Sequence, residues 1–395
     1  MSAKSLYKLF YSDKKQYEAE YSKRFGSDDT IHFDLSNGES KFFIYPSPSS
    51  LNTIIEIERI DKKINEIAAR LPDIATRQFA NRCLIEEVVK TNDIEGVHST
   101  RKEISEIIEN IDVYSKSDRF VGLVNKYTVL MNNEDIPLSV CKDIRKIYDD
   151  IFVAEIEKDD IPDGQYFRAK GVSVYGNDGK PVHHGLFPEK KIITAMNEAL
   201  GFLNNGNCDR LIRIAAFHFL FCYIHPFYDG NGRLSRFISC YLLSKYLNPL
   251  IGYRLSYTVK ERLGEYYKGF TICEHPNSRG ELTPFVEMFL QIILQSEEQL
   301  LEELTDKYEK LTYYEKLIPS LPNSGSKYIS EIYELLIQAS LFSHIGISRT
   351  DLMKYLNIGK STLSELMKLI PGELLISNRE SRRIYYMIDT DKVVS

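Results

Sequence analysis

Cysteine is scarce in this sequence and never occurs in closely spaced pairs. The six cysteines, at positions 83, 141, 208, 222, 240 and 273, include no CxxC spacing, and the eight histidines include no HxxxH spacing. This pattern argues against the usual zinc sites and disulfide frameworks. It favours a reducing compartment, and we expect a cytoplasmic protein.

Long hydrophobic runs and an excess of positive charge are also missing. The longest apolar run, IAAFHFLFCYI at residues 214–224, is too short to span a bilayer, so we expect a buried helix and no membrane partner. The opening MSAKSLYKLFYSDKK has no apolar segment, and we expect that it is not a secretory signal. Lys and Arg total 50 against 56 Asp and Glu, a net charge of −6, so nucleic-acid contact would need a local basic patch.

Helical periodicity dominates what is present. The 395 residues, 43% apolar and 27% charged, are typical of a soluble globular protein with two or three domains. Apolar residues recur at helical spacing from Leu51 through about Ile318, and we expect a mainly α-helical fold. Residues 33–48 and 166–187 instead predict β-hairpins around Asn-Gly and Gly-Asn-Asp-Gly turns. PSLPNSGS, at 319–326, predicts a linker.

The stretch HPFYDGNGRLSR, residues 225–236, carries more chemistry than a helix connection needs. Pro226 ends the preceding helix, and Gly230 and Gly232 permit backbone angles that other residues avoid. A new helix is expected to begin near Arg233. The Gly-Asn-Gly turn therefore lies at a helix N-terminus, where free N–H groups and the helix dipole favour an anion.

The charged residues of this stretch suit a nucleotide phosphate. Arg233 and Arg236 can add charge-assisted hydrogen bonds to an anion at the turn. Asp229 is placed to hold a hard cation such as Mg²⁺. His225 can accept a proton from a hydroxyl near pH 7. A lone Gly-Asn-Gly would more often be a plain turn, but the combination predicts a phosphate site with a base beside it.

The stretch resembles the signature of the Fic family, HPFx[DE]GNGRxxR, and matches it at every position. The resemblance extends over roughly residues 90–290. It implies a helical core with a β-hairpin flap at about 171–186, a helical N-terminal region and a small C-terminal winged helix-turn-helix domain. The implied segments are 1–110 with an inhibitory helix, 111–318 as the catalytic core, 319–326 as a linker and 327–395 as the winged helix.

Proteins of this family transfer a nucleotide, usually AMP from ATP, to a Ser, Thr or Tyr hydroxyl of a target protein, and pyrophosphate leaves. The resemblance implies a role for each motif residue. His225 would be the general base, Asp229 the Mg²⁺ ligand, Gly230, Asn231 and Gly232 the phosphate cradle, Arg233 the contact to a phosphate oxygen, and Arg236 the partner of the γ-phosphate. Phe227 would anchor the loop in the core. The flap would hold the target segment by strand addition.

The segment GEYYKGFTICEH, residues 264–275, resembles the lining of the adenine pocket in this family. Tyr267 and Phe270 fit as apolar walls. Some relatives carry Asn where this chain has Glu274, which leaves base selectivity open. The alternative is an ordinary amphipathic helix.

A second motif lies upstream, in KTNDIEGVHSTRKEI. By itself the segment indicates a helix that ends at Gly96 as its C-terminal cap. The family's inhibitory motif, [ST]xxxE[GN], is matched by Thr91, Glu95 and Gly96. A glutamate that reached Arg236 would occupy the arginine meant for the γ-phosphate and misplace ATP. Some relatives use this glutamate to remove AMP, so the reverse reaction is a further possibility.

Residues 348–388 resemble a winged helix-turn-helix, which suggests DNA contact. However, residues 327–395 hold nine Lys and Arg against eight Asp and Glu, which is a weak basic footprint. Lys360, Arg379, Arg382 and Arg383 could still form a local patch, but protein contact is the stronger expectation.

Three other functions compete with a self-inhibited adenylyltransferase. The core could transfer another group, it could remove AMP, or the chain could be a transcriptional regulator that senses nucleotide without catalysis. The intact His225 disfavours a sensor, which needs no base. By resemblance we also expect self-modification, a possible homodimer and a bacterial source.

Overall fold

The chain divides into two compact units, which are described separately. The computed structural model describes residues 4–111, 113–115, 118–152, 154–176, 179–380 and 383–394. Unit 1 comprises residues 1–61 and 86–298, and unit 2 comprises residues 62–85 and 299–395. Three long helices have residues in both: α3 (Pro48–Ala68), α4 (Asp73–Ile94) and α13 (Thr283–Leu317). The boundaries at 110, 318 and 326 stay predictions.

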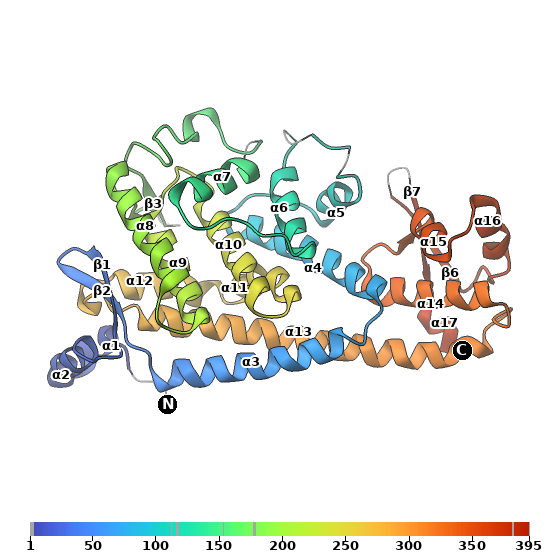
Figure 1. Ribbon diagram of the computed structural model, residues 1–395, viewed down its shortest axis with the longest axis horizontal. Helices are drawn as coiled ribbons and strands as arrows, with labels where there is room; N and C mark the ends of the chain where they lie inside the picture. Colours follow the sequence, from blue (N-terminus) through green and yellow to red (C-terminus); the bar gives the residue numbers. More distant parts are fainter. Residues whose placement is uncertain are drawn as a thin grey trace. The chain divides into compact units, whose positions relative to one another are not determined.

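Unit 1 is mainly helical, which confirms the expected fold class. Its remaining helices, with three short 3-10 turns, follow in chain order: α1 (Leu6–Ser12), α2 (Lys14–Phe25), α5 (Arg101–Glu109), α6 (Val121–Met131), α7 (Cys141–Phe152), η1 (Lys158–Asp160), α8 (Glu189–Asn205), α9 (Arg210–Ile224), α10 (Asn231–Tyr246), η2 (Pro249–Tyr253), α11 (Leu255–Glu261), α12 (Leu263–Glu274) and η3 (Pro276–Ser278). Helix α9 packs against both α8 and α10 (Figure 1).

The apolar run at 214–224 forms the centre of unit 1. Every residue of α9 from Ile214 to Ile224 except Cys222 is buried, because the helix is apolar on nearly all sides. One buried polar group lies in this helix. His218 lies 2.8 Å from Ser239 Oγ through Nδ1 and 2.7 Å from Tyr266 Oη through Nε2. Burial lowers the pKa of His218 to about 3, so a neutral ring joins α9, α10 and α12.

Two antiparallel hairpins complete unit 1. Strands β1 (Ile31–Asn37) and β2 (Ser40–Ile44) pair around the predicted Asn-Gly turn, where Gly38 has φ +60°. Strands β3 (Ser173–Tyr175) and β4 (Pro181–His184) form the second hairpin, with Ser173 opposite His184. Residues 177–178 of its predicted turn lie outside the described residues.

Unit 2 holds the C-terminal module. Its helices and strands after α13 are η4 (Ile318–Ser320), α14 (Lys327–Phe342), β5 (Ile347–Ser348), α15 (Arg349–Leu356), α16 (Lys360–Lys368), β6 (Leu375–Glu380), β7 (Arg383–Ile388) and α17 (Thr390–Val394). The strands form an antiparallel sheet in the order β5-β7-β6. The winged-helix assignment stays a prediction.

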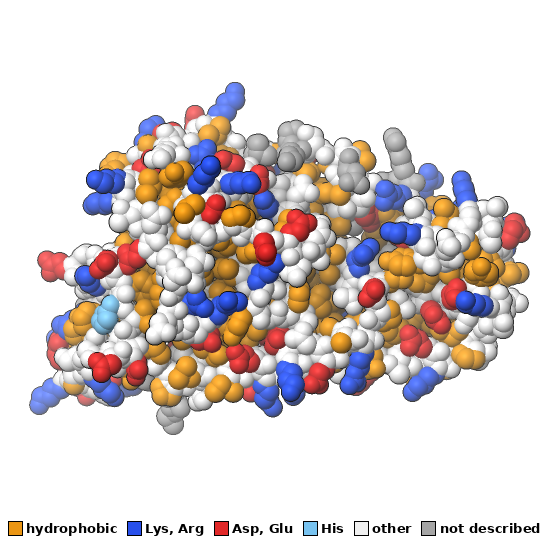
Figure 2. Space-filling model, in the orientation of Figure 1, with side chains coloured by type: hydrophobic (Ala, Val, Ile, Leu, Met, Phe, Trp, Pro, Cys, Tyr) orange, Lys and Arg blue, Asp and Glu red, His pale blue; other side chains and the backbone are white. Residues whose placement is uncertain are grey.

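The surface of unit 2 carries both signs of charge. On the face drawn in Figure 2, Lys and Arg side chains are interspersed with Asp and Glu. Lys360, Arg379 and Arg383 are exposed, and Arg382 of the predicted basic patch lies outside the described residues. DNA contact therefore remains a prediction.

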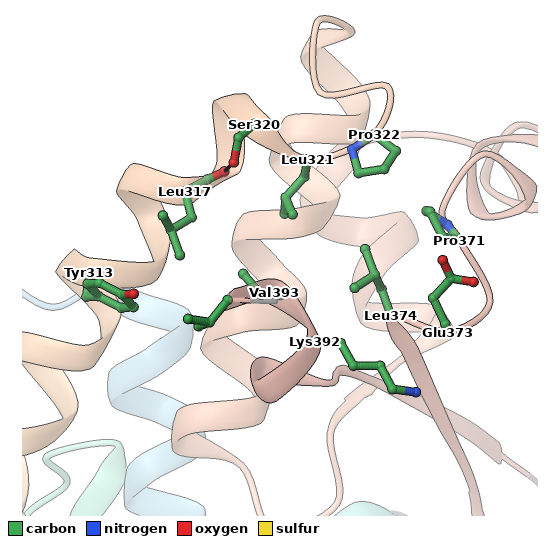
Figure 3. A pocket seen from close by; sticks show the side chains of 11 residues that line it. Tyr313, Leu317, Ser320, Leu321, Pro322, Pro371, Glu373, Leu374, Lys392 and Val393 are labelled. Carbon is green, nitrogen blue, oxygen red and sulfur yellow. Dashed lines mark hydrogen bonds between the residues drawn. The ribbon is translucent and has the colours of Figure 1, made fainter.

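Unit 2 also contains a cavity of about 510 Å³. The apolar residues that line it include Leu317, Leu321, Pro322, Leu374 and Val393 (Figure 3). Lys392 and Glu373 are the charged lining residues. The lining has no histidine and no pair of carboxylates, so it does not form an acid–base constellation.

In the described part of the chain, no helix is both long enough and apolar enough to span a membrane.

Candidate active site

The motif at 225–236 forms the turn between α9 and α10. His225 caps α9 in the left-handed region, with φ +51°, and its N–H donates to the Phe221 carbonyl over 3.0 Å. Gly230 caps the start of α10 with φ +80°, a conformation that strongly favours glycine. Helix α10 begins at Asn231, two residues before the expected start near Arg233. The predicted helix N-terminus therefore lies at the Gly-Asn-Gly turn.

Asn231 holds the loop in shape from within. Its Oδ1 accepts from the Phe227 N–H over 2.9 Å, and its Nδ2 donates to the Phe227 carbonyl over 2.8 Å. The Phe227 ring is fully buried and stacks on Tyr148, with ring centres 3.7 Å apart. Both polar groups of the Asn231 amide are engaged in this loop. Its side chain therefore shapes the cradle, and only its backbone faces the position predicted for phosphates.

His225 has the proton arrangement of a base. Its Nδ1 lies 3.4 Å from the Cys222 carbonyl, which can only accept, so Nδ1 carries the proton and Nε2 keeps its lone pair. The pKa of His225 is lowered to about 4, mainly by burial, with smaller contributions from the charges of His183 and Arg168. The ring is therefore neutral near pH 7 and can accept a proton at Nε2.

Arg168, which the sequence analysis did not single out, joins this loop to the second hairpin. It is fully buried, and Nε donates to the His225 carbonyl over 2.9 Å. Its other terminal nitrogens donate to the carbonyls of Lys170 and Leu186, which flank the hairpin. Burial lowers the pKa of Arg168. Its three carbonyl contacts fix the loop and the hairpin base to each other.

Arg233 faces two carboxylates. Its Nη1 lies 2.5 Å from Glu155 Oε2, and its Nη2 lies 3.4 Å from Asp229 Oδ2. Arg233 and Glu155 are nearly inaccessible to solvent, whereas the Asp229 side chain is 57% exposed. Burial raises the pKa of Glu155, although Arg233 opposes that shift. Asp229 is thus the carboxylate of this group that remains open to a cation.

Arg236 faces the upstream motif and does not share a partner with Arg233. Its Nη2 lies 2.7 Å from Glu95 Oε1 and 3.0 Å from the Thr91 carbonyl oxygen, and its Nε donates to Thr91 Oγ1 over 2.9 Å. Arg236 is 1% exposed and the Glu95 side chain 31%. Burial disfavours the charged guanidinium, but Glu95 outweighs it and the pKa of Arg236 is raised.

Two glycines allow Glu95 to reach this position. Gly96 has φ +71° and ends α4 in a Schellman motif, in which Val97 N–H donates to Asn92 O and Gly96 N–H to Asp93 O. Glu95 is thereby fixed as the last residue before the cap. At the other side, a Cβ on Gly232 would overlap Glu95 Oε1. The Glu95 carboxylate therefore lies against the first turn of α10, where the sequence predicts a phosphate anion.

Helix α12 contributes the residues expected at a base pocket. Tyr267 is 48% exposed, and Glu95 and Arg236 act electrostatically on its hydroxyl, with burial the main cause of its raised pKa. Phe270 packs inward, 4.6 Å from Phe285 between ring centres. Tyr267 can therefore line an open surface, while Phe270 supports α12 from inside.

The sequence profile of the Fic/DOC family matches residues 137–243, which include the whole 225–236 motif. Over this segment the chain is similar to the Fic/DOC family. Glu95 and α12 lie outside the matched residues, so their roles rest on the geometry described above.

Three solved structures are similar to this chain. A Fic family protein from Desulfovibrio desulfuricans G20 is 20% identical, with a TM-score of 0.55 over 87% of this chain and 97% of that chain. Fic-1 (residues 134–508) from C. elegans is 18% identical, with a TM-score of 0.46 over 65% of this chain and 74% of that one. A Fic domain containing signaling protein from Bacteroides thetaiotaomicron VPI-5482 is 15% identical, with a TM-score of 0.44 over 64% of this chain and 97% of that chain. The first of these supports the mainly helical fold.

Proposed function

We propose that this protein is a Fic-type transferase that moves AMP from Mg²⁺–ATP to a Ser, Thr or Tyr hydroxyl of a protein, itself included, and that Glu95 restrains it. One observation carries the proposal. A neutral base, two buried arginines and a glycine-lined helix N-terminus converge on a single turn. The match of residues 137–243 to the Fic/DOC profile supports an enzyme of this class.

In the proposed reaction, the target hydroxyl oxygen attacks the α-phosphorus of ATP. A bond forms between these atoms, the bond from the α-phosphorus to the oxygen of the β-phosphate breaks, and pyrophosphate leaves. The hydroxyl proton passes to His225 Nε2. The lowered pKa of His225 supports this role because the ring is uncharged before the reaction.

The phosphates would occupy the N-terminal turn of α10. Backbone N–H groups at this turn and the helix dipole favour negative charge. Gly232 leaves room there, since a Cβ would fill the space that the Glu95 carboxylate now occupies. Arg236 would pair with the γ-phosphate once Glu95 has left, and Arg233 would contact a phosphate oxygen.

Asp229 suits the proposed cation. Its carboxylate supplies hard oxygen ligands of the type that Mg²⁺ prefers, and the side chain is 57% exposed. Bound there, Mg²⁺ would neutralise phosphate charge and help to orient the leaving group. Asp229 would then hold the cation at the open edge of the turn, opposite the buried Arg233.

The restraint is electrostatic and steric. The Glu95 carboxylate holds the guanidinium that would bind the γ-phosphate, and it lies against the helix turn that would receive the phosphates. ATP bound beside it would have its α-phosphate misplaced for in-line attack, which can remove orders of magnitude in rate.

The test uses ATP labelled at the α- or the γ-phosphate, with Mg²⁺, on Glu95→Gly and on the double variant Glu95→Gly/His225→Ala. We expect label on protein from the α-position only, and its loss in the double variant. Label from the γ-position only would indicate phosphate transfer instead. No label from either position, with ATP still bound, would favour a nucleotide sensor or another donor.

A further inference from the structure

His183, on strand β4, is held from two sides. Its Nε2 lies 2.8 Å from the carbonyl oxygen of Tyr223 on α9. Its Nδ1 lies 2.7 Å from Glu274 Oε2 at the end of α12. The two side chains are only 11% and 20% exposed, so little water screens the contact. One imidazole thus connects the hairpin to two helices.

Both ring nitrogens of His183 face oxygen acceptors. A backbone carbonyl has no proton to give, so Nε2 must donate to Tyr223. A carboxylate likewise only accepts, so the contact to Glu274 needs a proton on Nδ1. The arrangement is satisfied by an imidazolium paired with a carboxylate, which makes the hydrogen bond charge-assisted.

The anchored strand lies directly beside the base. The rings of His183 and His225 are 6.1 Å apart. Leu186 N–H donates to the Ile224 carbonyl over 3.1 Å. A Cβ on Gly185 would lie 2.9 Å from the Cβ of His225. The end of β4 therefore follows the last residues of α9 into the turn that holds His225.

We propose that His183 is a positioning residue for the transfer reaction: anchored by Glu274, it fixes strand β4 against the turn that carries His225. The proposal rests on the proposed function and on the expectation, from the family resemblance, that the hairpin holds the target segment by strand addition. A hydroxyl on a strand beside β4 would then lie at a fixed distance from Nε2 of His225. Holding the reacting groups in a fixed geometry accounts for a large part of the rate enhancement of a transfer reaction.

The contact between His183 and Glu274 also links the hairpin to helix α12. Glu274 ends α12, the helix predicted to line the nucleotide base. The same carboxylate that anchors the hairpin therefore belongs to the helix beside the base pocket. The positive charge of His183 also adds to burial in lowering the pKa of His225, which supports the role without carrying it.

The test compares Glu274→Ala, Glu274→Gln and Glu265→Ala in the full chain. Glutamine can donate from its amide to an unprotonated Nδ1, so it keeps the link without the charge. Glu265 is the matched control, because it lies on the same helix, is 61% exposed and pairs with Arg262. The readouts are amide hydrogen exchange in residues 173–176 and 179–184, and the ring ¹⁵N shifts of His183.

We expect hairpin exchange about ten- to a hundredfold faster in Glu274→Ala, equivalent to the loss of a hydrogen bond to a charged group. Glu274→Gln should restore slow exchange, and its His183 ring should change from doubly to singly protonated. Glu265→Ala should match the wild type. Unchanged exchange in Glu274→Ala would overturn the proposal.

A second assay tests the positioning role of His183 separately from the proposed AMP transfer. It measures labelling of the protein from α-labelled ATP, with Glu95→Gly added to each variant. Labelling should fall about tenfold or more in Glu274→Ala and recover in Glu274→Gln. Faster exchange with unchanged labelling would overturn the positioning role. If no variant is labelled, including Glu95→Gly alone, the proposed transfer is wrong. The exchange and ¹⁵N results would still decide the anchor itself.

Discussion

Glu95, the residue directly after α4, forms an ion pair with Arg236 of α10, with Oε1 2.7 Å from Nη2. Arg236 is buried, and Thr91 accepts from two more of its N–H groups. Under the proposed function, the chain itself supplies an anion to the site that the phosphates would occupy. Because Glu95 is part of the same chain, it would compete with a nucleotide at a high effective concentration.

Thr91→Val should destabilise the protein by about 1.5–3 kcal/mol. Valine has nearly the same shape but no acceptor, so the Arg236 Nε–H that now donates over 2.9 Å would be buried without a partner. Thr91→Ser keeps the oxygen and should lose less. Urea unfolding of the three proteins measures the difference. A change below about 0.5 kcal/mol in Thr91→Val would show that this hydrogen bond does not hold Arg236.

Gly232→Ala should displace Glu95 without activating the protein. The added methyl group would overlap the Glu95 carboxylate, but it would fill the same space that a phosphate needs. We expect Gly232→Ala to be labelled at about the wild-type level. The double variant Glu95→Gly/Gly232→Ala should be labelled at least about tenfold less than Glu95→Gly alone. High activity of Gly232→Ala would mean that phosphates do not use this space.

The pH profile of the Glu95→Gly variant should have its acidic limb near pH 4, because the pKa of His225 is lowered to about 4. A lowered histidine pKa means that the unfolded chain takes up the proton first, at about 6.5. The contribution of His225 to stability is therefore present above that pH and is lost as pH falls toward 4. Initial rates of labelling between pH 4 and 8 measure the limb. A limb near 6.5 would contradict the buried, neutral base.

Arg168→Lys should loosen the second hairpin and the 225–236 turn together. The planar guanidinium donates to three carbonyls at once, which a single ammonium cannot reproduce. We expect a loss of about 2–4 kcal/mol in unfolding free energy and faster amide exchange in both segments. Arg145→Lys, a change in an arginine whose side chain is 24% exposed and pairs with Asp149, is the control. Equal stability of the two variants would exclude the role given to Arg168.

Much of the turn could be predicted from the sequence, because its signals are local. Pro226, Gly230 and Gly232 indicate a helix end, a turn and a new helix within a few residues. Gly96 predicts a helix cap, and the structure has φ +71° there. Such positions depend on backbone angles that few other residues adopt.

The partners of the charged groups could not be predicted in the same way. Glu155 and Arg233 are 78 positions apart, and His183 and Glu274 are 91 apart. Arg168 lies in an unremarkable stretch before the hairpin, and its contacts to carbonyls leave no trace in residue type. Tertiary packing brings these groups together, and no periodic pattern in the sequence indicates which groups will be in contact. The sequence therefore shows which charged groups are present, and the structure shows which of them are in contact.

The most direct test of the account is the rate at which α-labelled ATP labels the wild type, Glu95→Gly and Asp93→Ala. Asp93 is the matched control, since it lies in the last turn of α4 but its side chain is 52% exposed and pairs with Lys260. We expect Glu95→Gly to exceed the wild type by at least about tenfold and Asp93→Ala to match it. Equal rates in all three proteins would contradict the claim that the Glu95–Arg236 pair restrains the site.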